Sequence, residues 1–150
     1  MRSLLQRVSS ASVSIDGKTV SSIQHGLLIL LGIEEADTTE DMDWLCGKIT
    51  RLRIFEDEDG KMNRSIQDTH GDVIVVSQFT LHASTKKGNR PSFLKAAAPA
   101  ISEPLYDTFC LSLENELGRN IGRGVFGADM QVSLINTGPV TIWIDSRNRE

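Results

Sequence analysis

The sequence predicts one α+β domain over residues 1–150, with mixed or antiparallel sheets and two main helices. Strand patterns cluster toward both ends of the chain, and the regular alternation of strand and helix that marks a parallel α/β sheet is absent. The length of 150 residues is the commonest size of one compact domain. Hydrophobic residues make up 39% of the chain, which is enough to form a core without metals or disulfides.

Strands are expected first. Apolar and polar residues alternate from Leu5 to Ile15, as in a strand with one buried face, and the inward candidates are Val8, Ala11, Val13 and Ile15. Asp16-Gly17 follows, and this dipeptide favours a tight hairpin turn because both central residues need positive φ. A second strand should span Thr19 to Gln24. The continuous apolar run from Leu27 to Ile33 indicates a strand buried on both faces.

An amphipathic helix should come next. Asp37 with Glu40 three residues later resembles a capping box, which starts helices. Apolar residues then recur at spacings of three and four, at Met42, Leu45, Ile49 and Leu52. The acidic segment from Glu56 to Asn63 contains a glycine turn but no closing glutamate of a calcium loop, so a loop or hairpin tip is expected.

Strand and helix patterns also occur in the second half of the chain. A strand is expected from Val73 to Leu81, and a helix from Ser102 to Leu117, with Pro104 in its first turn and Gly118 at its end. Two further strands, from Met130 to Asn136 and from Val140 to Asp145, are separated by Thr137-Gly138-Pro139. Glycine followed by proline signals a turn, so these residues alone favour a plain hairpin connection.

Charge and composition narrow the class of protein. The formal net charge of −4 excludes the overall basic surface of a protein that coats nucleic acid, so DNA is not an expected partner. A local cationic segment carries Lys86, Lys87, Arg90 and Lys95; it is either an RNA contact or a solvated loop. No apolar run is long enough to span a bilayer, and the first residues do not form a signal peptide. With Cys46 and Cys110 outside any bridge or metal pattern, a cytoplasmic protein is expected.

The residues Ser77, Gln78, Phe79 and Thr80 are the first candidates for chemistry. On an extended strand Gln78, Thr80 and His82 would share one face, because side chains alternate across a strand. Thr80 could then act as a nucleophile activated by His82. The alternatives are a polar strand face turned to water, and catalysis by backbone N–H groups at the end of the strand.

Metal and cofactor sites are not expected. The three histidines show no metal-binding spacing and have no cysteine pair nearby. The glycine-rich segment from Gly118 to Gly127 fits neither a P-loop nor a dinucleotide fingerprint, so a flexible loop is expected there.

Several segments together resemble the D-aminoacyl-tRNA deacylase family. They are SQFTL at 77–81, KGNRPSF at 87–93, FGADMQVSL at 126–134 and NTGPVT at 136–141. The opening LLQRVSSASV and the stretch LRIFEDEDGKMN are similar too, so the resemblance covers nearly the whole chain in the same order. It implies hydrolysis of the ester in D-aminoacyl-tRNA, and of glycyl-tRNA, by a cytoplasmic enzyme without a cofactor. It also implies a β-barrel-like core and a homodimer with each active site at the subunit interface.

The resemblance assigns roles to individual residues. Ser77, Gln78, Phe79 and Thr80 would line the catalytic pocket. Gly138-Pro139 matches a Gly-cisPro motif that enters the partner's site and, with Met130 and Arg7, would serve chiral selection by filling the space of an L side chain. Thr137, at a position that is commonly acidic or otherwise polar in the family, is a mild departure.

Two mechanisms and two other functions stay open at this level. Thr80 is one candidate nucleophile, but we favour assistance by the terminal ribose hydroxyl of the tRNA with backbone donors from the protein. Lys86, Lys87 and Arg90 would contact the acceptor end, because cations fix phosphate without reading sequence. The alternatives are a non-catalytic module that binds RNA ends and a small-ester hydrolase that uses Thr80.

Overall fold

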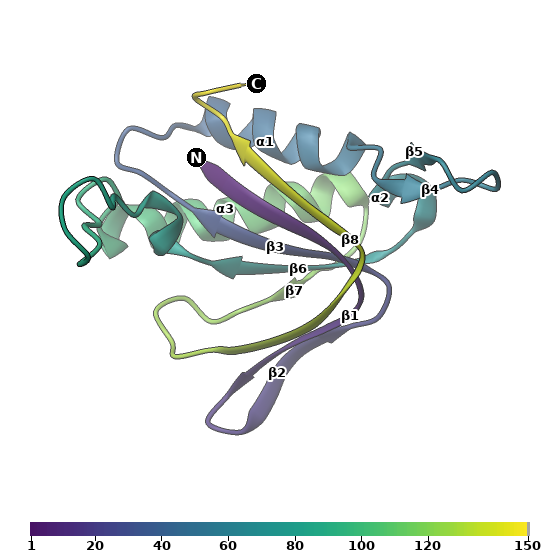
Figure 1. The fold of residues 1–150 in the computed structure, drawn as a ribbon, viewed down its shortest axis with the longest axis horizontal. Coiled ribbons are helices and arrows are strands. Elements are labelled where there is room, and N and C mark those ends of the chain that lie inside the picture. The colour runs from purple at the N-terminus through teal and green to yellow at the C-terminus, as the bar shows by residue number, and fades with distance from the viewer. Residues whose placement is uncertain (150) are drawn as a thin grey trace.

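A computed structural model describes residues 1–149 and confirms the α+β class (Figure 1). The largest sheet has the strand order β2-β1-β3-β6-β7, and β8 pairs with the other side of β1. The sheet curls into a nearly closed, barrel-like form with the helices against one face. The elements are β1 (Arg2–Ile15), β2 (Lys18–Ile23), β3 (Gly26–Gly32), α1 (Thr39–Arg51), β4 (Phe55–Glu56), β5 (Met62–Arg64), α2 (Ile66–Thr69), β6 (Asp72–Ser77), the 3-10 helix η1 (Phe79–His82), α3 (Pro99–Leu117), β7 (Gly122–Arg123) and β8 (Gln131–Asp145).

The strand β1 organises the sheet. Its first half pairs with β3 and its second half with β2, both antiparallel, while β8 runs along its opposite edge. The turn between β1 and β2 is the expected one, since Asp16 and Gly17 have φ of 49° and 76°. β3 pairs in parallel with β6 from Gly26 and Asp72 to Leu31 and Ser77. The carboxyl ends of β3 and β6 therefore meet at one edge.

The core has two layers because β3 and β6 are buried on both faces. Alternate residues of these strands point toward α1 and α3 and pack with them; this cluster includes Leu27, Ile29, Leu31, Val73, Val75, Leu45, Ile49, Phe109 and Leu113. The intervening residues point into the curl of the sheet, with Val8, Ala11, Val13, Leu28, Ile74 and Val76. Each fully buried aliphatic side chain stabilises the fold by about 1.5 to 3 kcal/mol.

Both cysteines lie inside this core. Cys46 on α1 and Cys110 on α3 are free thiols with no exposed surface. Burial raises the pKa of Cys46 to about 12 and that of Cys110 to about 11, because the thiolate is poorly solvated there. These are packing residues, as the sequence suggested, and no described helix is long and apolar enough to cross a membrane.

Both main helices start at other residues than expected. The capping box of α1 is formed by Thr38 and Asp41, whose carboxylate accepts the Thr38 N–H at 3.0 Å. Asp37 instead accepts a hydrogen bond from the Glu34 backbone at 2.8 Å. The helix α3 begins at Pro99, a residue suited to the first helical position because its missing N–H would have no partner there.

Three further expectations concern the helix α3, the glycine-rich segment after it and the acidic segment before β5. Pro104 lies inside α3 rather than in its first turn, and Gly118 ends the helix in the left-handed conformation, as expected. The segment from Gly118 to Gly127, expected to be a flexible loop, contains the short strand β7, which pairs with β6. A hydrogen bond from Gly124 N–H to Val75 O at 2.9 Å follows it. The acidic segment before β5 is the tip of the β4–β5 hairpin.

Candidate active site

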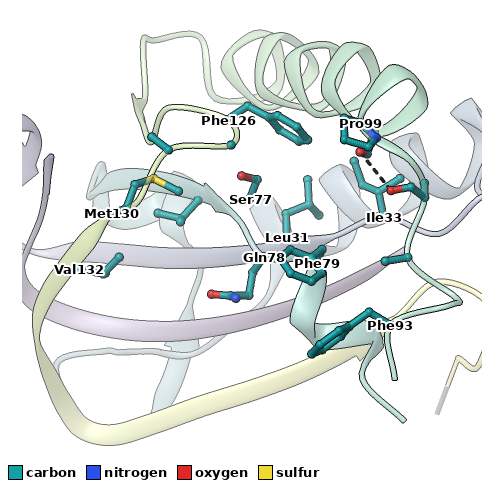
Figure 2. Close-up of a pocket in the computed structure, with 16 residues that line it drawn as sticks. Leu31, Ile33, Ser77, Gln78, Phe79, Phe93, Pro99, Phe126, Met130 and Val132 are labelled. Carbon is teal, nitrogen blue, oxygen red and sulfur yellow. Dashed lines mark hydrogen bonds between the residues drawn. The ribbon is translucent and has the colours of Figure 1, made fainter. Parts of the chain in front are cut away.

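A pocket of about 610 Å³ opens where β3 and β6 end (Figure 2). This size is typical of small-ligand sites, which are mostly apolar with a few polar groups. Its lining joins the strand ends to α3 and to the segment before β8, and consists of Leu31, Ile33, Val76, Ser77, Gln78, Phe79, Phe93, Ala96, Ala97, Pro99, Ser102, Phe126, Gly127, Ala128, Met130 and Val132. Four of the expected residues, Ser77, Gln78, Phe79 and Met130, therefore meet in one cavity.

The polar edge of the pocket forms because β6 ends earlier than expected. Gln78 donates its backbone N–H to Leu31 O at 2.7 Å, and the chain then turns into η1. The expected continuation of the strand to Leu81 is wrong, and with it the shared face of Gln78, Thr80 and His82. Gln78 still contacts Thr80, since its Nε2 donates to Thr80 Oγ1 at 2.5 Å, but Thr80 does not line the pocket.

His82 cannot serve Thr80 as a base in this arrangement. Its side chain is buried with 1% exposure, whereas Thr80 is exposed. Neither ring nitrogen of His82 has a hydrogen-bond partner among the described residues, and Glu34 Oε2 is 3.8 Å from its Nδ1. Burial lowers the pKa of His82 because the imidazolium would be poorly solvated. The strand face that was expected to join the two residues is absent, and no hydrogen bond links them among the described residues, so the structure does not support the pair of nucleophile and base.

Two aromatic wall residues, Phe93 and Phe126, were not among the candidates from the sequence. Phe79 and Phe93 meet edge to face with ring centroids 5.1 Å apart at the mouth of the pocket, where Phe79 is 57% exposed. On the opposite wall lies Phe126, whose ring centroid is 6.0 Å from that of Tyr106. Phe93 and Phe126 lie in segments that carry the family resemblance, which was the available signal for them. An aromatic mouth of this kind can pack against a flat ring of a ligand.

The segment around Gly138-Pro139 is a bulge within a single strand, not a hairpin. β8 pairs with β1 on both sides of it, with Val8 opposite Asn136 and Gln6 opposite Thr141. Residues 137–140 thus lie opposite Arg7 alone, and the Gly138–Pro139 peptide bond is cis. The Asn136 side chain ties the bulge together by accepting the Val140 N–H at 2.8 Å and donating to Thr141 Oγ1 at 2.8 Å.

Arg7 holds this bulge from the opposite strand. Its guanidinium is 6% exposed, donates from Nε to Thr137 O at 3.0 Å and from Nη1 to Ile54 O at 2.7 Å, and lies 3.4 Å from Glu56 Oε1. A buried cation requires such partners because its desolvation costs several kcal/mol. The residue thus connects β1, the bulge of β8 and the start of β4.

The bulge lies away from the pocket of its own chain. Arg7 is paired with Leu27 near the amino end of β3, whereas the pocket begins at Leu31 near the carboxyl end. The separation along the strand is roughly 13 Å at 3.3 Å per residue. Gly138 and Pro139 are exposed and do not line the cavity. One copy of the chain therefore does not bring its own bulge to its own pocket.

The cationic residues Lys86, Lys87 and Arg90 lie in an exposed loop close to the pocket mouth. The loop is closed by the backbone pair Ser84 and Ser92, with N–H to O distances of 2.8 and 2.9 Å. It leads directly into Phe93, which lines the pocket.

In residues 1–149 no group of three or more histidine, cysteine or carboxylate side chains is arranged to hold a metal ion.

Residues 4–145 match the family model described as D-Tyr-tRNA(Tyr) deacylase. The chain belongs to this family. A protein of Flavobacterium johnsoniae named D-aminoacyl-tRNA deacylase is 62% identical over 150 residues, and one of Bacteroides thetaiotaomicron with the same name is also 62% identical; each alignment covers 100% of both chains. The enzyme class expected from the sequence, an ester-cleaving hydrolase, is confirmed.

Two solved structures share the fold. One, titled c-Myc DNA Unwinding Element Binding Protein, is 40% identical, with a TM-score of 0.91 over 97% of this chain and 98% of that chain. The other is titled as a structural analysis of a probable eukaryotic D-amino acid tRNA deacylase. It is 18% identical, with a TM-score of 0.82 over 95% of this chain and 97% of that chain, and supports the fold alone.

Replacing Gly138 should destabilise the bulge. Gly138 has φ of 128°, and an added Cβ would lie 2.9 Å from both Arg7 Nη2 and Val140 Cγ2. We expect Gly138→Ala to lower the free energy of unfolding by about 1 to 3 kcal/mol, measured by urea denaturation. Gly60→Ala is the control, because Gly60 also has positive φ but open space around it. An equal loss in both variants would show that contact with Arg7 does not matter.

Proposed function

We propose that this enzyme hydrolyses the ester that joins a D-amino acid to the terminal ribose of tRNA, and also that of glycyl-tRNA. The observation that carries the proposal is the apolar pocket with Ser77, Gln78 and Phe79 at its edge, in a chain whose relatives are named for this reaction. In the reaction a water oxygen adds to the ester carbonyl carbon, and the bond from that carbon to the ribose oxygen breaks. The ribose oxygen takes up a proton, so free tRNA and the free amino acid leave.

The protein supplies positioning and backbone donors rather than a side-chain base. The Gln78 N–H is bound to Leu31 O, so the N–H groups that come next, at the start of η1 beside the pocket, are the ones suited to stabilise the oxyanion of the tetrahedral intermediate. His82 is buried and makes no hydrogen bond to Thr80 among the described residues, so it is not placed to activate that hydroxyl. The free hydroxyl of the terminal ribose, next to the ester, is then the group that assists the attacking water.

Chiral selection in this proposal comes from a second copy of the chain. The bulge at Gly138 and Pro139 projects from β8, and the partner's bulge would enter the pocket and fill the volume that an L side chain needs. A D side chain points elsewhere and glycine has none, so both are accepted. Two exposed apolar side chains on the same strand, Ile135 at 62% and Trp143 at 49%, support β8 as part of the dimer interface.

The tRNA would enter past the loop that carries Lys86, Lys87 and Arg90, whose cations can hold phosphates of the acceptor end. Aminoacylated tRNA is then the substrate, and the cytoplasm the place of action. The small-ester hydrolase that uses Thr80 has less support, because its base would be His82. The non-catalytic RNA-end module has less support because the family is one of enzymes.

The first prediction concerns chirality. Purified protein should release amino acid from D-tyrosyl-tRNA at least about 100-fold faster than from L-tyrosyl-tRNA, because the L side chain is excluded from the pocket. The measurement is the loss of acid-precipitable labelled amino acid with time, beside a reaction without enzyme. Equal rates on the two substrates would refute chiral selection, and no release from either would refute the activity.

The second prediction concerns Thr80. Thr80→Val keeps the size of the side chain and removes the hydroxyl, and should retain deacylation of D-tyrosyl-tRNA within about tenfold. Removal of a covalent nucleophile costs on the order of 10⁴ to 10⁶ in kcat. Thr80→Ser is the matched control, since it restores a hydroxyl. A loss of that order in Thr80→Val that Thr80→Ser repairs would establish Thr80 as the nucleophile.

A further inference from the structure

A second, shallow groove of about 300 Å³ lies at the carboxyl end of α1 and shares no residue with the active-site pocket. Its lining contains cations and one indole, and consists of Trp44, Gly47, Lys48, Arg51, Leu52 and Arg53. α1 lies on the helical side of the molecule, in the layer above the sheet in Figure 1. None of these residues has a part in the proposed reaction.

A glycine inside α1 gives the groove its shape. Gly47 is buried in the interior of the helix, where glycine costs about 1 kcal/mol relative to alanine. A Cβ at this position would collide with the guanidinium of Arg51, which lies across the glycine. The missing side chain therefore lets Arg51 fold back along the helix and form one wall of the groove.

The charges around the groove are mostly positive. Lys48 Nζ and Arg149 Cζ lie 5.6 Å and 4.4 Å from the centre of the Trp44 ring. Arg53 donates to the backbone and the side chain of Asn63 at 2.9 and 2.7 Å, and remains exposed.

Nearby acids neutralise only part of this charge. Glu116 lies 3.7 Å from Arg51, whose side chain is 67% exposed, Asp43 is on the same helix, and Asp68 interacts electrostatically with Arg53. A helix dipole explains cations in the last turn, such as Lys48 and Arg51. It does not explain Arg53 and Arg149, which lie outside the helix.

Arg7 links the chain at the rim of the groove to the bulge of β8. Arg53 precedes Ile54, whose carbonyl accepts the hydrogen bond from Arg7 Nη1 at 2.7 Å, and Arg7 also binds Thr137 O in the bulge. In the proposed dimer this bulge enters the partner's pocket. The chain at the rim of the groove would then be joined, through Arg7, to the segment that reaches the tRNA end in the partner's pocket.

We propose that this groove binds backbone phosphates of the tRNA, so that the acceptor end is held by two basic surfaces. This inference rests on the proposed function. Guanidinium groups bind phosphate through two parallel hydrogen bonds, and a lysine adds a mobile charge. In a chain with net charge −4, affinity for RNA requires such local cationic surfaces.

The test is binding of uncharged tRNA by the full-length protein over a range of salt concentrations. Lys48→Glu should weaken binding about tenfold at low salt and reduce the salt slope by about one to two, because a phosphate contact is lost. Lys18→Glu makes the same charge change at the exposed β1–β2 hairpin and should bind within about twofold of wild type. Equal weakening in both variants, or in neither, would overturn the proposal that the groove binds tRNA phosphates.

Two further measurements keep the result decisive. Thermal unfolding shows whether Lys48→Glu is folded; if it is not, Arg53→Gln replaces it, with a loss of about threefold expected and no change contradicting the groove. Binding of uncharged tRNA does not require ester hydrolysis. A wild-type protein that binds tRNA through Lys48 but leaves D-tyrosyl-tRNA intact would contradict the proposed activity and not the groove.

Discussion

The structure depends on the buried guanidinium of Arg7. An uncompensated cation at this depth would cost several kcal/mol, so the carbonyl groups of Thr137 and Ile54 must stay where they meet it. One of these carbonyls belongs to the bulge of β8 and the other to the chain leaving α1. The opposite strand thereby fixes an irregular segment that no regular sheet pairing would hold. These contacts restrain the exposed edge at Gly138.

The position of the bulge has a consequence for the active site. The bulge lies near the amino end of β3, and the pocket lies at the carboxyl end, beyond Leu31 and Ser77. In the proposed function the two come together only between copies of the chain. The pocket wall then has two sources: an apolar cavity from one copy, and the backbone of residues 138 and 139 from the other. The proposed reaction relies on backbone donors and the ribose hydroxyl of the tRNA, so neither copy has to supply a side-chain base to this shared site.

The sequence predicted the elements whose signal is local. The alternation from Leu5 to Ile15, the turn at Asp16-Gly17 and the buried run of β3 all appear as expected, because a few neighbouring residues decide them. The end of β6 was missed because its pairing partner decides it: the last ladder bond runs from Gln78 N–H to Leu31 O, near the end of β3, and the chain then turns into η1. The continuity of β8 was missed because only pairing with β1 reveals it. Ser77 to Phe79 were candidates from their place at the end of a predicted strand, whereas Met130 was connected to the pocket only by the family resemblance.

Mixed dimers test most directly whether the bulge of one copy completes the pocket of the other. One variant, Ala128→Trp, fills the pocket, and the other, Gly138→Ala, disturbs the bulge. The Ala128→Trp homodimer should be inactive, and the Gly138→Ala homodimer should release amino acid from L-tyrosyl-tRNA as well as from D-tyrosyl-tRNA, because its bulge no longer excludes the L side chain. After equal amounts of the two are unfolded and refolded together, half of the dimers are mixed, and each has one open pocket that receives an intact bulge. Release from L-tyrosyl-tRNA should then fall to about a quarter of that of the same total amount of the Gly138→Ala homodimer, whereas release from D-tyrosyl-tRNA should fall to about half. An equal fall to about half on both substrates, in a mixture shown to contain mixed dimers, would contradict a site shared between subunits.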